Sequence, residues 1–309
     1  MRVGIVILPD QRWSEASRRW RQAEEYGFDH AWTYDHMGWR DLVDGPWFDA
    51  VPVLTAAALV TSRIRLGTMV ASPNFRHPAH FAREVTALDD MAGGRLTLGL
   101  GAGGMGYDAT VLGLPAMSPR QRVDRFAEFV TLLDGLLRDG SADFSGEHYR
   151  AVDARSTPGC VQRPRAPFVV AANGPRSMRL AARFGQGWVT TGERSTDLGA
   201  WWQSVAELAK RFDDVEAAAG RGPGELDRML SLDAAPVFSL SSAGFFADAA
   251  GRARELGFTD VITHWPRSDS WYAGSEATLE TVAKNVLPAI QQTAPRLGPP
   301  TSTSRVEPR

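Results

Sequence analysis

Cysteine and lysine are scarce in this sequence, and long apolar runs are missing altogether. The one cysteine, Cys160, cannot form an internal disulfide, which suits a reducing compartment. No run approaches the roughly 18 apolar residues of a membrane-spanning helix, and the N-terminal run that ends at Leu8 lacks a signal-peptide cleavage pattern. These absences exclude a disulfide-stabilised secreted domain and lead us to expect a cytoplasmic protein with no membrane partner.

A dominant charge is missing as well. The 34 basic and 36 acidic residues leave a net charge of −2 at pH 7, so we expect no electrostatic attraction to nucleic acid or to an anionic membrane. Among the basic residues only Lys210 and Lys284 are lysines, a bias toward arginine that indicates a GC-rich bacterial genome. The expected partner is therefore a small molecule.

Short apolar runs that alternate with helix-like stretches are, in contrast, abundant. We expect strands at residues 3–8, 30–34, 64–70, 96–100, 168–172, 187–191, 229–235 and 261–263. We expect helices at 14–26 (capped by Ser14), 52–60, 78–91, 120–137, from 175 onward, and at 200–219, 243–256 and 276–291. Eight such units predict an α/β fold, the (β/α)8 TIM barrel, whose functional residues lie at the C-terminal ends of the strands.

The chain is longer than a plain barrel, which needs roughly 250 residues. We place the excess of this 309-residue chain in short insertions after strands two and four, at residues 35–49 and 139–167. Phe144, Tyr149 and Val152 in the second insertion predict a small hairpin or flap. Residues 293–309, rich in Pro, Ser, Thr and Arg, predict a disordered tail, so that residues 1–292 form a single barrel domain.

The turn after the second strand carries the best candidates for proton chemistry. Asp35 and His36 stand where barrels place catalytic groups, and a histidine can take or give a proton as a hydride moves. The alternative is that His36 only bonds a neighbouring strand. Trp39 and Trp47 line a substrate pocket or simply pack, and His264 ends the last strand at the same mouth.

Two glycine-containing turns suggest how a cofactor could be held. Residues 99–104 satisfy G-x-G-x-x-G, but no helix can begin before Pro119, which excludes the dinucleotide-binding interpretation. Instead, Ala102 and Gly103 let a flat ring lie against the backbone, unless the glycines merely fit a crowded turn. The other turn precedes a helix and consists of Ala172, Asn173, Gly174, Pro175, Arg176 and Ser177. Free N–H groups at the start of that helix suit a phosphate, and side chains of the turn supply further donors. The alternative is an ordinary βα turn with no ligand.

A metal site is not expected. His77 and His80 lie three residues apart at a helix start, but no carboxylate or cysteine joins them, or His264, at ligand-like spacing.

Three groups of motifs occur in a fixed order. They are YDH (34–36), LGT (66–68) and RHP (76–78); GRL (94–96) with LGLGAG (98–103); and AANGP (171–175) with GQGW (185–188). Together, over about residues 2–290, they resemble the bacterial luciferase-like superfamily of flavin- and deazaflavin-dependent oxidoreductases.

The resemblance implies a cofactor phosphate at residues 173–177, His36 near the reactive edge of the ring, and Asp35 in contact with the cofactor. It also implies a non-prolyl cis peptide at Met69–Val70 behind the ring, and a homodimer. One departure concerns Gly104, because the sugar-phosphate dehydrogenases of the superfamily have a glutamate there. Tyr107 and Asp108 are the nearest polar residues, and we place Tyr107 in the substrate pocket.

Two coenzymes remain candidates for the cofactor. Coenzyme F420 would give hydride transfer to or from a substrate, and we favour it; reduced FMN with O2 would give a monooxygenase. A third possibility is a non-catalytic flavin-binding sensor. The tryptophans of the mouth favour a bulky, mostly apolar substrate; these are Trp39, Trp47, Trp265 and Trp271.

Overall fold

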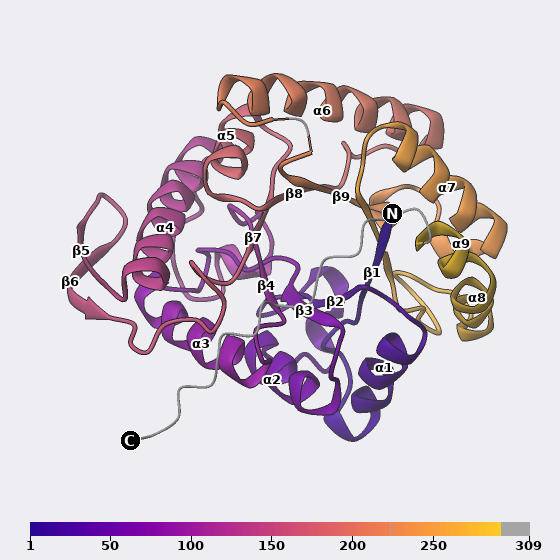
Figure 1. The fold of residues 1–309 in the computed structure, drawn as a ribbon, viewed down its shortest axis with the longest axis horizontal. Coiled ribbons are helices and arrows are strands. Elements are labelled where there is room, and N and C mark those ends of the chain that lie inside the picture. The colour runs from indigo at the N-terminus through magenta and orange to yellow at the C-terminus, as the bar shows by residue number, and fades with distance from the viewer. Residues whose placement is uncertain (223, 292–309) are drawn as a thin grey trace.

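Eight parallel strands close into a barrel in a computed structural model, which describes residues 1–222 and 224–291 (Figure 1). The predicted tail at 293–309 lies outside the described residues. The strands are β1 (Arg2–Val6), β2 (His30–Thr33), β3 (Arg65–Thr68), β4 (Leu96–Leu100), β7 (Phe168–Ala171), β8 (Gly187–Thr190), β9 (Asp227–Ser231) and β10 (Asp260–His264). Each pairs in parallel with its neighbours, and β10 returns to β1. The predicted TIM barrel is confirmed.

Helices follow the strands and form the outer ring (Figure 1). They are α1 (Trp13–Glu25), α2 (Ala50–Val60), α3 (Pro78–Met91), α4 (Pro119–Asp139), α5 (Pro175–Phe184), α6 (Leu198–Ala218) and α7 (Ala243–Glu255). The predicted cap at Ser14 is wrong, since α1 follows Arg12 and no side chain caps it. Helix α2 begins before Pro52 because Asp49 accepts the N–H of Val51.

Two elements differ from their predictions: one strand ends earlier than predicted, and one helix changes type along its length. Strand β9 stops at Ser231, and a 3-10 helix at Leu232–Ala234 replaces the rest of the predicted strand. The last predicted helix is split into α8 (Glu276–Thr281), a π-helical turn (Val282–Val286) and α9 (Leu287–Gln291). Pro288 explains the split: it has no N–H for an α-helical bond, and the Leu287 N–H reaches back five residues to the Val282 carbonyl.

Alternate side chains along each strand fill the barrel, which is packed rather than open. Its central layer is apolar and consists of Val6, Trp32, Val169, Val189, Met229 and Ile262. The Trp32 ring needs the room that Gly67 leaves, because a Cβ built on Gly67 would lie 2.5 Å from Trp32 Cζ3 and 2.3 Å from the Thr97 carbonyl oxygen.

The base of the barrel, at the N-terminal ends of the strands, is polar and joins the first and last strands. The Arg2 guanidinium donates two hydrogen bonds of 2.7 Å to Asp260, and His30 Nε2 lies 2.9 Å from the same carboxylate. These partners lower the pKa of the fully buried Asp260 to about 2, against the opposing effect of burial. Beside them, the Met1 ammonium donates to the Ile290 carbonyl at 3.1 Å.

Both predicted insertions are present. Residues after β2 form a loop with a 3-10 helix at Arg40–Asp44, and the predicted hairpin consists of antiparallel strands β5 (Ser141–Ser145) and β6 (Arg150–Arg155) beside α4 (Figure 1). A long loop joins β4 to α4, as expected from the prediction that no helix begins before Pro119.

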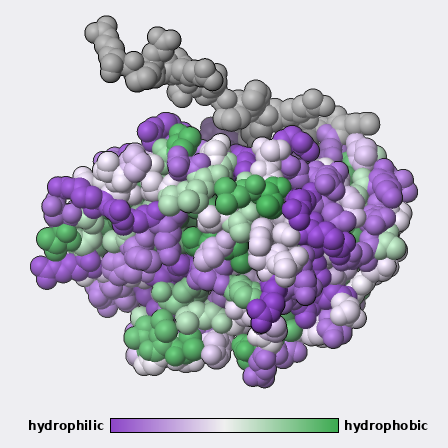
Figure 2. All heavy atoms as spheres, turned by 90° about the horizontal axis from the view of Figure 1, so that it is seen from below, coloured by the Kyte–Doolittle hydropathy of each residue, from purple (hydrophilic) through white to green (hydrophobic). Residues whose placement is uncertain are grey.

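The surface is mostly hydrophilic, interrupted by hydrophobic patches (Figure 2). Several large apolar side chains are exposed on the loops after β2 and β4; they are Met37, Met105, Tyr107, Leu112 and Leu114. None of the helices in the described ranges combines the length and apolar character needed to cross a bilayer.

Candidate active site

The floor of the barrel mouth is formed by side chains that continue the inward-facing rows of the strands. Tyr34 follows β2, Met69 follows β3, Ala171 ends β7, and all three pack on the central apolar layer together with Tyr272. The peptide between Met69 and Val70 is cis, as the sequence resemblance implies. Any ligand that enters the mouth therefore meets this floor.

His36 lies at this mouth and is paired with Asp108 from the loop after β4. Its Nδ1 is bonded to Asp108 Oδ2, while Oδ1 accepts the Met37 N–H at 2.8 Å. An ionised carboxylate only accepts hydrogen bonds, so in the neutral imidazole the proton lies on Nδ1 and Nε2 carries the lone pair. Nε2 makes no hydrogen bond to the described residues, and the side chain is 28% exposed. This arrangement suits a proton acceptor whose positive form Asp108 stabilises.

Asp108 is the residue that sequence reasoning undervalued. Tyr107 was preferred for the pocket, yet its ring is 46% exposed, and it packs so closely on Gly38 that a Cβ there would lie 2.9 Å from Tyr107 Cδ1. Asp108 is only 4% exposed. A buried carboxylate near a candidate histidine was the available signal.

Asp35 lies in different surroundings from His36, and its role in proton transfer or cofactor contact stays a prediction. It points away from the barrel axis, where both carboxylate oxygens accept hydrogen bonds from Arg76, at 2.7 and 2.9 Å. Burial raises the pKa of Asp35, and the Arg76 guanidinium opposes that effect. Strand alternation accounts for the difference, since Trp32 and Tyr34 face inward and Asp35 follows on the opposite side. Asp35 therefore holds the Arg76 guanidinium in place.

The glycines in and after β4 have two kinds of surroundings: the first ones are tightly packed, and the last one borders open space. A Cβ on Gly99 would lie 2.0 Å from the Thr68 carbonyl oxygen, and one on Gly101 would lie 2.6 Å from Val70 Cγ2. Gly103 has a φ of +78°, and its Cβ would strike Asn74. The crowded-turn interpretation therefore explains Gly103, while Ala102 beside it is partly exposed. Above Gly104 the space is open.

The start of α5 has free donors, as the phosphate prediction requires. Among α2 to α7, the ring helices that the structure describes after α1, α5 alone lacks a side-chain cap. The Ser177 hydroxyl is 8% exposed and makes no hydrogen bond to the described residues, and the space above Gly174 is open. These features fit an anion.

The other predicted residues of this turn have different partners. The Asn173 amide bonds Thr190 Oγ1 and the Gly192 carbonyl, each at 2.8 Å, while Arg176 pairs with Asp124. The Ala172 carbonyl accepts from Trp188 Nε1 at 2.7 Å, and Pro175 supplies the first turn of α5.

Sequence reasoning missed a buried cation on α4, next to Asp124. Arg125 is 8% exposed and donates to Asn74 Oδ1 at 2.5 Å, but its Nε is buried without a partner. Burial lowers the pKa of Arg125, and no carboxylate among the described residues pairs with it. A buried guanidinium with an unused donor fits an anionic group at the same side of the mouth.

Aromatic side chains wall the opposite side of the mouth. Trp39 stacks on Tyr272 and meets Trp271 edge-on, with the Arg40 guanidinium 4.4 Å from the centre of the Trp39 ring. Trp47 donates from Nε1 to the His36 carbonyl at 2.7 Å, which fixes the loop after β2. His264 lies beneath Tyr272, with ring centres 3.7 Å apart, and hydrogen-bonds the Tyr34 hydroxyl. Trp39, Trp47 and His264 are thus brought together with His36, while Trp265 lies elsewhere, stacked on Tyr26.

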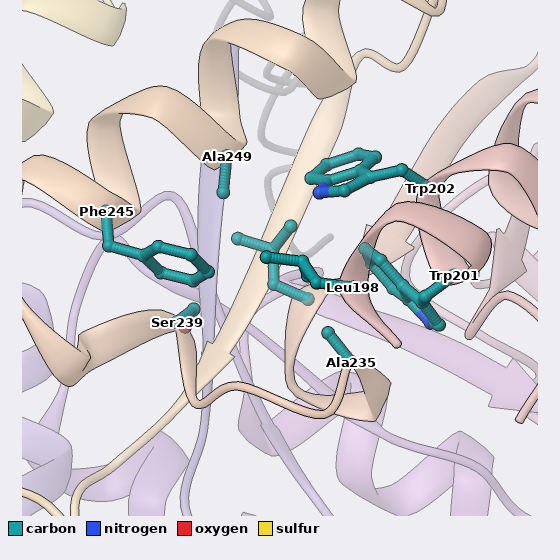
Figure 3. A pocket seen from close by; sticks show the side chains of 8 residues that line it. Leu198, Trp201, Trp202, Ala235, Ser239, Phe245 and Ala249 are labelled. Carbon is teal, nitrogen blue, oxygen red and sulfur yellow. The ribbon is translucent and has the colours of Figure 1, made fainter. Parts of the chain in front are cut away.

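Two further features lie outside this cluster. A narrow apolar crevice between α6 and α7 is lined by Leu198, Trp201, Trp202, Phe245 and Ala249, with Ser239 at its edge (Figure 3). In the described part of the chain, no three His, Cys, Asp or Glu side chains group as metal ligands would. His77 instead caps α3 by accepting the Ala79 N–H at 3.2 Å.

Comparison with known proteins places this geometry in a family context. A family model described as luciferase-like monooxygenase matches residues 1–236. The F420-dependent glucose-6-phosphate dehydrogenase of Kineococcus radiotolerans is 36% identical over 234 residues, which cover 73% of this chain and 66% of that protein. The protein of the same name from Beutenbergia cavernae is 30% identical over 318 aligned positions, covering 87% and 91%. The chain thus spans just under two thirds of the first relative and nine tenths of the second.

Solved structures share the fold at low sequence identity. An F420-dependent secondary alcohol dehydrogenase in complex with an F420-acetone adduct has a TM-score of 0.77 at 18% identity, covering 94% of this chain and 98% of that one. A long-chain alkane monooxygenase has a TM-score of 0.76 at 13% identity, covering 96% and 92%.

Proposed function

This chain belongs to the luciferase-like monooxygenase family, and from that premise we propose that it is a deazaflavin-dependent oxidoreductase using coenzyme F420. It transfers a hydride to or from a bulky, mostly apolar organic substrate. The observation that carries the proposal is the His36–Asp108 pair, with His36 Nε2 unbonded at the barrel mouth. A hydride-transfer reaction on an alcohol or carbonyl needs such a proton acceptor or donor.

The residues present fit a phosphorylated ring cofactor. The Ser177 hydroxyl, the first N–H groups of α5 and Arg125 Nε would hold its phosphate, and the open surface by Ala102, Gly104 and Gly174 would accept its body. When bound, the deazaflavin supplies a two-electron hydride acceptor or donor. Met69 and Val70 support it from the barrel floor.

His36 handles the proton in this scheme. Its Nε2 accepts the proton of a substrate hydroxyl, and Asp108 stabilises the resulting imidazolium through Nδ1. In the reverse direction Nε2 returns the proton to a carbonyl oxygen. Asp35 holds Arg76, and through it the turn before α3.

The substrate class rests on the mouth itself. Trp39, Trp47 and Tyr272 form an aromatic wall, and position 104 is a glycine. We therefore infer an apolar alcohol or ketone rather than a sugar phosphate.

The test is a fluorescence titration of the protein with coenzyme F420 and, separately, with FMN, followed by turnover on apolar secondary alcohols and on glucose 6-phosphate. Submicromolar binding of F420 with turnover of the apolar alcohols is the expected result. Tighter binding of FMN with oxygen uptake would instead make the protein a monooxygenase, which the exposed apolar loops after β2 and β4 also suit. Preferential turnover of glucose 6-phosphate would overturn the substrate class, and tight binding without any turnover would indicate a sensor.

We also propose that the protein is a cytoplasmic homodimer, in keeping with the family resemblance. Exposed apolar side chains such as Leu112, Leu114 and Val152 support a self-contact. Light scattering after gel filtration checks this, and a mass of one chain across the concentration range would refute it.

A further inference from the structure

We propose that Tyr34 and Tyr272 form a second proton-transfer site at this mouth, which exchanges a proton with a substrate hydroxyl or carbonyl and stores it on His264. The inference rests on the proposed function and adds a proton route that does not pass through His36. It follows from the donor-to-acceptor direction of the hydrogen bonds that join four side chains, those of Asp233, His264, Tyr34 and Tyr272.

The direction is set at the buried end by Asp233. Its Oδ2 accepts the backbone N–H of His264 at 2.7 Å and lies 2.9 Å from His264 Nδ1. A carboxylate can only accept, so in the neutral imidazole the ring proton is on Nδ1 and Nε2 accepts in turn. Tyr34 Oη lies 2.9 Å from that Nε2 and therefore donates to it. The Tyr34 oxygen then accepts from the Tyr272 hydroxyl, at 2.8 Å.

Asp233 is fixed in place for this role. Its side chain has no exposed surface, and Oδ1 accepts the Ser239 N–H at 2.8 Å. Ser239 is bonded to Thr263 at 2.7 Å and lies at the edge of the crevice between α6 and α7 (Figure 3). A fixed, buried carboxylate beside an imidazole stabilises the imidazolium form.

The other end of the chain of hydrogen bonds is Tyr272, which is partly exposed. The Tyr272 hydroxyl bonds only Tyr34 among the described residues, so its oxygen lone pairs are available to a donor. A substrate hydroxyl that donates there can lose its proton to Tyr272 as Tyr272 passes its own to Tyr34 and Tyr34 passes its own to His264 Nε2. Each O–H bond that breaks is replaced by one that forms, and no electrons change hands. In the reverse direction the same groups deliver a proton to a carbonyl oxygen.

The backbone and the electrostatics both favour such a relay. Tyr272 has a φ of +64°, a conformation that side-chain-bearing residues rarely adopt, and this places its ring flat on His264. The pKa of Tyr34 is raised well above its ordinary value and that of Tyr272 to about 12; burial is the main cause, the charge of Asp233 adds to the rise, and Arg40 opposes it. Both hydroxyls therefore stay protonated at neutral pH and pass protons without holding charge.

The experiment uses Tyr34→Phe and Tyr272→Phe, which keep the rings and remove one hydroxyl each. Nitrogen-15 NMR of the cofactor-free protein reads the tautomer of His264, one of only six histidines. We expect Tyr34→Phe to move the Nε2 signal downfield, to the position of an unbonded ring nitrogen. In turnover, each variant should lose about 100-fold in kcat with little change in KM, as for a general acid or base. Tyr26→Phe, whose hydroxyl meets Glu280 away from the mouth, is the matched control.

The outcomes separate this proposal from the proposed function. An unchanged His264 signal in Tyr34→Phe overturns the relay whatever the cofactor, because that measurement needs no turnover. Wild-type kcat in Tyr272→Phe also overturns it. Failure of the wild-type protein to bind either coenzyme overturns the proposed function and leaves the NMR result standing by itself.

Discussion

Asp260 offers a quantitative test of how the base of the barrel is held. Its pKa falls from an ordinary value of 3.8 to about 2 in the folded protein because Arg2 and His30 stabilise the charged form. At about 1.4 kcal/mol per tenfold change in proton affinity, that difference is worth about 2–3 kcal/mol of folding free energy. The side chain has no exposed surface, so solvent screening does not reduce the value.

The sign follows from the lowered pKa. Because the unfolded chain binds a proton more readily than the folded one, the contribution is complete above about pH 5 and is lost as the pH falls toward 2. Urea unfolding of the wild-type protein and of Asp260→Asn at pH 7, 5, 4 and 3 measures this contribution to the free energy of unfolding. The wild type should lose stability with acid more steeply than the variant, with the two curves converging by about 1 kcal/mol between neutral pH and pH 3.

Asp260→Asn also leaves Arg2 and His30 without their charged partner, so at pH 7 we expect it to be less stable by about 3–5 kcal/mol. Asp143→Asn, which alters an exposed carboxylate on the hairpin, is the control and should keep the wild-type pH dependence. Parallel pH curves for the wild type and Asp260→Asn would refute the assigned role of this carboxylate.

Three further outcomes are expected. Asp108→Asn should lower kcat by about 10- to 100-fold with KM nearly unchanged, because a hydrogen bond to a charged partner is worth about 1.5–3 kcal/mol; steady-state kinetics with wild-type-like kcat would contradict it. Ser177→Ala should weaken cofactor binding by about tenfold without changing kcat at saturation, as measured by fluorescence titration; equal affinity would remove the phosphate from this turn. Gly67→Ala should destabilise the fold by about 1–3 kcal/mol, because the added methyl group would clash with Trp32. Gly135→Ala, in open space on α4, should stabilise the fold by about 0.5–1 kcal/mol. Similar thermal unfolding of the two variants would disprove the packing argument.

The alternation of apolar runs and helices was enough to predict the barrel, because each strand buries both faces and each helix one. Element ends were harder to predict. The cap of α2 at Asp49 and the π-helical turn before Pro288 depend on single hydrogen bonds that periodicity does not report. The hairpin was predictable because Phe144 and Tyr149 are apolar residues in an otherwise polar segment.

The site was predicted in part, for a similar reason. Position at a strand end predicted that Asp35 and His36 lie near each other, but it could not predict their partners: Asp35 is bonded to Arg76 and His36 to Asp108. Arg125 and Asp233 were missed because each reaches the mouth from an element distant in sequence. Contacts of that range are set by the closed barrel and have no local signature.

The bond between the Met1 ammonium and the Ile290 carbonyl has a practical consequence. Residues 1 and 290 therefore meet at the base of the barrel, where Arg2 pairs with Asp260, and Figure 1 shows α9 near the start of the chain. A short peptide linking them would allow circular permutation, and a tag or solid support attached there would leave ligand entry unobstructed. Engineering at this end therefore need not interfere with catalysis.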